Sequence, residues 1–186
     1  TDGGVAWGQA AGTAQVAPTV TKVVGGGSLL AGTYTVVYLY VREVSGVNVA
    51  MGNPSLTASV TVSANDRISV TNIRNPADPA SADYDPQVTH VYIYRSLAGG
   101  SSPLLFFDTK VTAAGVGTLS ATLSQADTAL GSQVETDNNP PPAFSTIVLH
   151  QEHIIGLTGT DNTVYHSKRF RPESFPTGNQ LDIGSR

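Results

Sequence analysis

Residues 32–41 form the most regular apolar stretch of the chain, reading Gly-Thr-Tyr-Thr-Val-Val-Tyr-Leu-Tyr-Val. Nearly every residue in it is β-branched or aromatic, and such side chains fit a pleated, partly buried surface. Side chains alternate between the two faces of a strand, and both sets carry apolar bulk here. The pattern predicts a long strand from Gly32 to about Val44, central in its sheet and covered on both faces.

Shorter segments of the same kind recur along the chain, with glycine, proline or asparagine between them. The expected strands cover residues 19–24, 56–62, 67–73, 88–95, 104–109, 119–123, 147–149, 153–157 and 163–167. We expect turns at residues 45–46 and 52–55 and a loop over residues 75–86. No segment repeats apolar residues at helical spacing, so helix should be scarce. Strands about every 8–12 residues with turn signals between them favour a β-sandwich.

The chain divides by composition into four parts, and the predicted fold class is all-β. Residues 1–17 are rich in Gly and Ala around Trp7 and are expected to form a linker or docking arm. Residues 18–134 hold the strands of the sandwich, and residues 135–142 contain three consecutive prolines that impose a stiff, extended hinge. Residues 143–186 form a small β-meander. Both ends read like those of a piece of a longer polypeptide, or of a processed chain.

The composition narrows the kinds of partner. Only 13% of the residues are charged, and 21 threonines with many serines and asparagines take the place of charge. Ten Lys and Arg against 14 Asp and Glu give a net charge of −4, which argues against a surface that grips nucleic-acid phosphates. The absence of cysteine excludes disulfides and thiolate metal sites. No run approaches the roughly 20 apolar residues of a membrane span.

Histidines supply the best candidates for a metal or catalytic site. His150 and His153 flank Glu152, but residues three apart on a strand face opposite sides, so they could share an ion only if the chain bends there. His166 precedes Ser167, and adjacent strand side chains diverge, so this histidine is poorly placed to activate the serine. We therefore expect no metal, no cofactor and no catalytic residue at these positions.

Acidic and aromatic residues form two further groups. Asp78, Asp83 and Asp85 share one loop and could offer oxygen ligands to Ca²⁺, but their spacing matches no calcium loop, so we expect a solvated turn. Tyrosines on the two strongest strands could line a sugar-binding platform, although core packing with hydroxyls at the rim is their more ordinary role. These tyrosines are Tyr34, Tyr38, Tyr40, Tyr92 and Tyr94.

The interaction surface that we expect has two parts. Trp7 is the only large apolar residue of the arm and could dock onto a neighbour. Lys168, Arg169 and Arg171 form the one basic cluster of the chain. The cluster is short, and phosphate binding usually needs several clustered cations, so a solvated strand end is expected there rather than a nucleic-acid contact.

The first β unit resembles a fibronectin type III-like module of the kind common in bacteriophage virion proteins. The residues that carry the resemblance are Gly-Thr-Tyr at 32–34, the tyrosine-rich strand after it, Asn-Pro-Ser at 53–55, the strand 60–62 and His-Val-Tyr-Ile-Tyr-Arg-Ser at 90–96. The last of these looks like the Tyr-Arg-Ile-Tyr-Arg strand of such modules. The resemblance implies an immunoglobulin/fibronectin III-like sandwich.

The second β unit resembles the opening blade of the β-propeller-like region in tail structural proteins of short-tailed phages, such as nozzle or tail-tube proteins. The residues that carry it are Pro140, Pro141 and Pro142, His150, Ile-Ile-Gly at 154–156, Val-Tyr-His-Ser-Lys at 164–168 and Arg-Pro-Glu-Ser-Phe-Pro at 171–176. A propeller needs at least four blades, so the resemblance implies a partial blade.

Together the two resemblances imply a structural component of a bacteriophage tail, located in the virion and without catalysis. Its expected partners are other copies of itself and neighbouring tail proteins, and DNA could pass through a lumen without specific binding. One alternative is a carbohydrate-binding or adhesive β-sandwich module of a surface or secreted protein. Another is an accessory domain of an enzyme.

Overall fold

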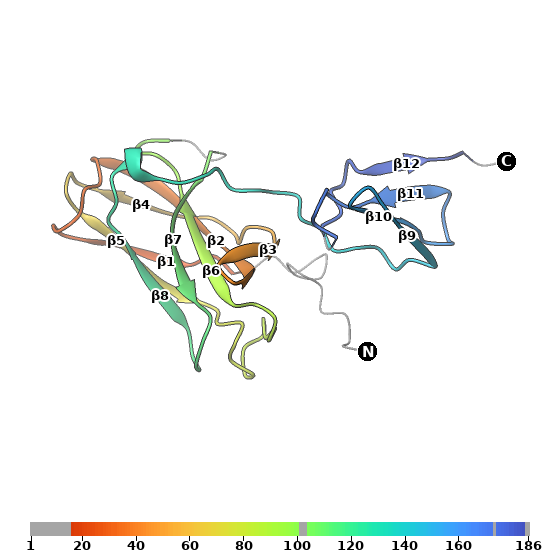
Figure 1. Cartoon of the computed structure of the whole chain (residues 1–186). Coiled ribbons are helices and arrows are strands. Elements are labelled where there is room, and N and C mark those ends of the chain that lie inside the picture. Colours follow the sequence, from red (N-terminus) through yellow and green to blue (C-terminus); the bar gives the residue numbers. More distant parts are fainter. Residues whose placement is uncertain (1–15, 101–103, 173, 185–186) are drawn as a thin grey trace.

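The computed structural model describes residues 16–100, 104–172 and 174–184. Over these residues the protein is all-β, as the sequence predicts, with three antiparallel sheets and one short 3₁₀ helix (Figure 1). The strands are β1 (Thr19–Val23), β2 (Gly32–Val44), β3 (Val47–Met51), β4 (Ala58–Val62), β5 (Arg67–Ile73), β6 (His90–Arg95), β7 (Phe106–Thr112), β8 (Leu119–Leu123), β9 (Thr146–His150), β10 (His153–Leu157), β11 (Thr163–His166) and β12 (Gln180–Asp182), and the 3₁₀ helix is η1 (Asp127–Ala129).

Two sheets form the sandwich. One has the order β1-β5-β8, and the other has the order β3-β2-β6-β7 with β4 also paired to β2. The main core lies between them and contains Tyr34, Val36, Tyr38 and Tyr40 from one face of β2, packed with residues of β5, β6 and β8. The alternation along β2 thus directs one set of side chains into the interior of the sandwich.

The other face of β2 is also covered. Val37, Leu39 and Val41 pack in a second cluster that includes Tyr94 and Val134. Every residue from Tyr34 to Val41 is buried. The prediction of a central strand covered on both faces is therefore confirmed.

The order of the strands bears on the type of sandwich. Strands C, F and G are neighbours in one sheet of immunoglobulin-type sandwiches, and β2, β6 and β7 have this order. However, β8 follows them in the chain and returns to the opposite sheet, beside β5. The all-β sandwich is confirmed, and the fibronectin type III assignment stays a prediction.

Two strands were not predicted from the sequence. β3 lies between the two turns that we expected at residues 45–46 and 52–55, and it forms a hairpin with β2 around Ser45 and Gly46, whose φ angles are 52° and 77°. Two successive positive φ values are typical of the type I′ turn that joins antiparallel strands. β12 pairs with the first three residues of the preceding strand β11 and has only three residues itself, too few to stand out in the sequence.

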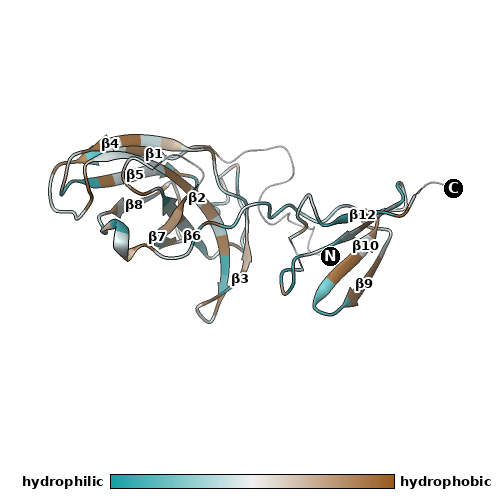
Figure 2. Ribbon diagram, turned by 90° about the horizontal axis from the view of Figure 1, so that it is seen from above, coloured by the Kyte–Doolittle hydropathy of each residue, from teal (hydrophilic) through white to brown (hydrophobic). Residues whose placement is uncertain are grey.

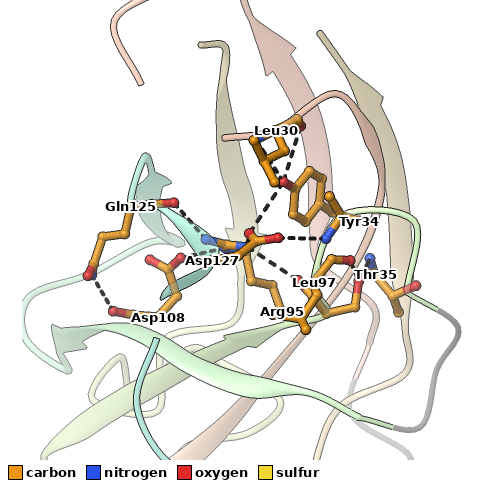
Figure 3. A network of polar contacts seen from close by, with 10 residues as sticks. Leu30, Tyr34, Thr35, Arg95, Leu97, Asp108, Gln125 and Asp127 are labelled. Carbon is orange, nitrogen blue, oxygen red and sulfur yellow. Dashed lines mark hydrogen bonds and ion pairs between the residues drawn. The ribbon is translucent and has the colours of Figure 1, made fainter. Parts of the chain in front are cut away.

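One buried ionic network closes an end of the sandwich (Figure 3). Arg95, at the end of β6, is fully buried, and its Nε donates to Asp108 Oδ2 on β7 at 2.6 Å. Its Nη1 donates to Asp127 Oδ1 at 2.6 Å and its Nη2 to the carbonyl of Gln125 at 2.7 Å. Its guanidinium also lies over the ring of Tyr34, 5.0 Å from the centroid.

The third sheet has the order β12-β11-β10-β9, so each strand pairs with its neighbour in the chain. This antiparallel meander occupies residues 146–182 and is joined to the sandwich by the proline-rich segment (Figure 1). Phe144 packs on one face of it, where a side chain in place of Gly156 would lie 2.5 Å from the Phe144 ring. Phe175 adds a second aromatic ring, and the centroids of the Phe144 and Phe175 rings lie 5.2 Å apart.

Candidate interaction surface

A polar cluster around Asn138 fastens the hinge. The backbone N–H of this buried residue donates to Asn53 Oδ1 (2.6 Å), and its Nδ2 donates to the carbonyl of Gly52 (3.2 Å), in the loop after β3. Its Oδ1 accepts from Lys168 Nζ (2.7 Å) and Ser174 Oγ (3.0 Å) of the second unit. One residue thus bonds to both units, and the hinge is fixed at this point.

Two of the three predicted basic residues face this cluster. Lys168 Nζ also donates to the carbonyl of Thr136 (3.1 Å) and lies 3.9 Å from the Glu135 carboxylate. Arg171 donates to Asn48 Oδ1 of β3 (3.1 Å) and lies 3.9 Å from the same carboxylate. These cations connect the second unit to the hinge and the sandwich, so fewer of their donors remain for an external partner.

Arg169 is separate from the other two. It donates to Glu152 in the β9–β10 turn (2.6 Å), and its Cζ lies 4.8 Å from the centroid of the Phe170 ring. Both charged side chains are largely exposed, and water weakens such pairs. The structure therefore divides the predicted basic cluster between an inner pair and one outer residue. Trp7 lies outside the described residues.

The second unit exposes apolar side chains over its sheet. Cross-strand pairing places one apolar row on a single face, running from β9 to β12: Val148, Ile155, Leu157, Val164 and Leu181. Val148, Leu157 and Leu181 are exposed, and Ile155 and Val164 are half-buried. The apolar strands β9 and β10 are brown in Figure 2. Contiguous apolar surface that faces solvent marks interaction sites in folded proteins, so this sheet is the strongest candidate surface on the described residues.

A second candidate is a groove of about 320 Å³ on the face of the five-stranded sheet that lies away from the main core. Its lining residues include Tyr92, Tyr94, Phe107, Lys110, Gln133 and Glu135. Tyr92 donates to Glu43, and Lys110 Nζ donates to the same carboxylate at 2.7 Å. Burial raises the pKa of Tyr94 to about 12, so its hydroxyl stays protonated at neutral pH.

The tyrosines predicted as a platform or as core residues divide between the two roles. Tyr34, Tyr38 and Tyr40 are buried in the main core, and Tyr94 is buried in the second cluster. Tyr92 is half-buried and packs against the Phe107 ring, with centroids 5.0 Å apart and planes tilted by 55°. Core packing is thus confirmed for four of the five.

The histidine candidates are placed by backbone contacts. His153 Nδ1 donates to the carbonyl of Ser167 (2.7 Å), and the His153 and His166 rings lie edge to face, with centroids 5.7 Å apart. Ser167 is buried, and its hydroxyl donates to the carbonyl of Lys168 (3.0 Å). The serine hydroxyl therefore has a backbone partner rather than a histidine base. His150 is exposed at the end of β9.

The three loop aspartates have separate partners. Asp78 accepts from the N–H of Gly117 (2.7 Å), which lowers the pKa of that carboxyl. Asp83 forms an ion pair with Arg74 (3.0 Å), and Asp85 accepts from the backbone of its own turn. No group of three or more His, Cys, Asp or Glu is arranged to hold a metal ion in the described part of the chain.

Two features of these surfaces were not predicted from the sequence, namely the role of Asn138 and the open edge of the second sheet at β9. Asn138 stands in the polar run Asp-Asn-Asn directly before the prolines, and such a run beside a hinge could have indicated a hydrogen-bonded junction. A strand was predicted at residues 147–149, inside β9, but the exposure of β9 depends on strand order, which the pattern does not give.

Comparisons with protein-family models, with curated proteins and with solved structures return no match for this chain. Across the residues that the structure describes, none of the helical structure is long and apolar enough to cross a membrane.

Proposed function

We propose that this chain is a structural component of a bacteriophage tail, of the nozzle, tube or adaptor kind, located in the virion and without catalysis. It assembles through its β-sheet surfaces with copies of itself and with neighbouring tail proteins, and DNA passes any lumen without specific binding. The observation that carries the assembly role is the exposed apolar sheet of the second unit. The resemblance to phage tail modules supplies the location.

The exposed sheet supports assembly for a physical reason. Burial of apolar surface stabilises by about 25 cal/mol per Å², so apolar side chains left in water at several positions of one sheet favour a partner. The low content of charged residues, 13%, also limits repulsion between closely packed copies. Identical subunits that associate through one surface form closed symmetric assemblies.

Two measurements test the proposal. Light scattering over a concentration series should give discrete multiples of the monomer mass of 19.3 kDa. Gold-labelled antibodies against the chain should mark the tail in electron micrographs of virions of the encoding phage. A chain that stays monomeric at every concentration, or virions without label, would contradict the proposal.

The groove beside Tyr92 favours a second candidate, a carbohydrate-binding or adhesive module. Aromatic rings beside amide and carboxylate groups are the side chains that bind sugar rings and hydroxyls. A glycan array separates the candidates, because specific glycan binding that Tyr92→Ala abolishes supports the module. Tyr84→Ala removes an exposed tyrosine elsewhere and is the matched control.

A further inference from the structure

Among the residues that the structure describes, β9 pairs only with β10, so it is an open edge of the four-stranded sheet (Figure 1). Its five residues are all exposed, and Ile147, Val148 and Leu149 have 61%, 56% and 70% of their surface in solvent. Natural edge strands are usually blunted by charged residues, proline, bulges or a covering segment, because an open edge pairs with other chains. β9 reads Thr-Ile-Val-Leu-His and contains none of those residue types.

The outward backbone groups of β9 belong to Ile147 and Leu149. Ser167 N–H donates to the carbonyl of Ile154 at 2.9 Å, so Ile154 directs its backbone toward β11 and Ile155 directs its own toward β9. Ile155 lies opposite Val148, which therefore bonds inward. The residues on either side of Val148 present their N–H and C=O groups to the free edge.

The strand is self-complementary about Val148. A second β9, antiparallel and related by a two-fold axis, places Val148 opposite its own copy and Ile147 opposite Leu149. The outward backbone groups then meet their counterparts on each side of the axis, in the alternating pattern of an antiparallel ladder. Each apolar side chain gains an apolar neighbour, and no like charges face each other.

The other edge of the sheet fits a partner less well. β12 has three residues and ends in Asp182, an exposed carboxylate that accepts from Gly184 N–H at 2.8 Å. Pairing β9 with β12 of another copy would set an uncharged strand of five residues against a shorter strand with a carboxylate. A second β9 matches both the length and the charge of the first.

We infer that β9 pairs antiparallel with β9 of a second copy of this chain, which joins two four-stranded sheets into one continuous sheet. The inference rests on the proposed assembly function and names the surface that this function uses. The pairing also brings together the two apolar rows that start at Val148, so one face of the joined sheet presents a doubled apolar surface to further neighbours.

A single-cysteine experiment tests the pairing directly, because the chain contains no cysteine. Opposed residues of a non-hydrogen-bonded antiparallel pair have Cα atoms about 4.5 Å apart, within the range of a disulfide. With oxidised glutathione as the oxidant, Val148→Cys should give a covalent dimer on a non-reducing gel. Val116→Cys, an exposed valine in the loop between β7 and β8, should stay monomeric.

Charge variants test the two-fold register. Val148→Lys and Val148→Glu should each dissociate the dimer, because each places like charges side by side at the axis. An equal mixture should restore a dimer that contains one of each, as measured by native mass spectrometry. Val116→Lys is the matched control and should dimerise like the unmodified chain.

The outcomes separate this inference from the proposed function. If the unmodified chain assembles but Val148→Cys does not cross-link, β9 is not the interface and only the inference is wrong. If Val148→Cys cross-links but the charge variants do not recombine, the two-fold register is wrong. If the unmodified chain is monomeric at every concentration, the assembly function fails as well.

Discussion

Arg95 is the residue on which the closed end of the sandwich most depends. It is fully buried and bonds to Asp108, Asp127 and the carbonyl of Gln125. Burial raises the pKa of Asp108, while the nearby guanidinium acts in the opposite direction. A buried charge needs partners of opposite sign, because its desolvation is not otherwise offset. Arg95 therefore ties β6 to β7 and to the segment around η1.

Replacing Arg95 with Met keeps an unbranched apolar stem in place of the aliphatic part of the arginine but leaves the Asp108 and Asp127 carboxylates without their cation. We expect the free energy of unfolding to fall by about 3–5 kcal/mol, the usual cost of breaking a buried pair. Arg42→Met, at an exposed arginine, should change it by less than about 0.5 kcal/mol. Urea unfolding followed by tyrosine fluorescence measures the free energy of unfolding of each variant. Equal free energies of unfolding for Arg95→Met and Arg42→Met would contradict the role given to Arg95.

The sequence predicts the strand that ends at Arg95 but not its partners. Asp108 lies 13 residues further along the chain and Asp127 lies 32 residues away, so only the folded sandwich brings them together. The core positions of Tyr34, Tyr38 and Tyr40 were easier to predict, because these residues share one face of the apolar strand β2. Long-range ionic contacts carry no comparable periodic signal.

Among the elements, some strands were predicted with the bounds that the structure has, others such as β6 were predicted with bounds that differ by a few residues, and two short strands were missed. β2, β5, β8 and β10 begin and end where the sequence predicts. β3 and β12 were not predicted because they are short and because pairing with a neighbouring strand, rather than their own pattern, makes them strands. Strand order, and with it the open edge at β9, depends on tertiary packing.

At the hinge, Asn138 is the residue to test. Asn138→Ala removes the side-chain hydrogen bonds to Lys168, Ser174 and the carbonyl of Gly52, which costs about 1–3 kcal/mol. The backbone N–H groups of Phe175 and Thr177 donate to the hinge residues Asn139 and Asp137. Because the substitution makes local opening of the hinge easier, hydrogen exchange of these two amides should accelerate about 5- to 100-fold.

Asn162→Ala is the matched control for that change, since Asn162 is exposed in the β10–β11 turn. In the Asn162→Ala variant, the hydrogen-exchange rates of the amides at residues 175 and 177 should equal those of the unmodified chain. Unchanged rates in Asn138→Ala would mean that the hinge is held by the remaining contacts, chiefly those of Arg171 with Asn48 and of Asp137 with Thr177.

For the whole molecule, the distribution of apolar surface separates the two β units. The sandwich buries apolar side chains in two clusters, one on each face of β2. The four-stranded sheet has aromatic cover on one face and leaves its edge strand in solvent. The spacing of the strands predicted both units. It could not show which unit leaves apolar side chains in solvent, because the exposure of a strand depends on which other segments cover it.

Assembly of the whole chain should respond weakly to salt. The proposed β9 contact is apolar and uncharged, and each copy has a net charge of −4, so added salt screens a weak mutual repulsion. We expect the association constant to rise by less than about threefold between about 50 and 500 mM NaCl, measured by sedimentation equilibrium. Arg169→Gln removes the exposed pair with Glu152 and should respond in the same way. Binding that weakened steeply with salt would instead indicate an ionic interface, as for proteins that grip phosphates.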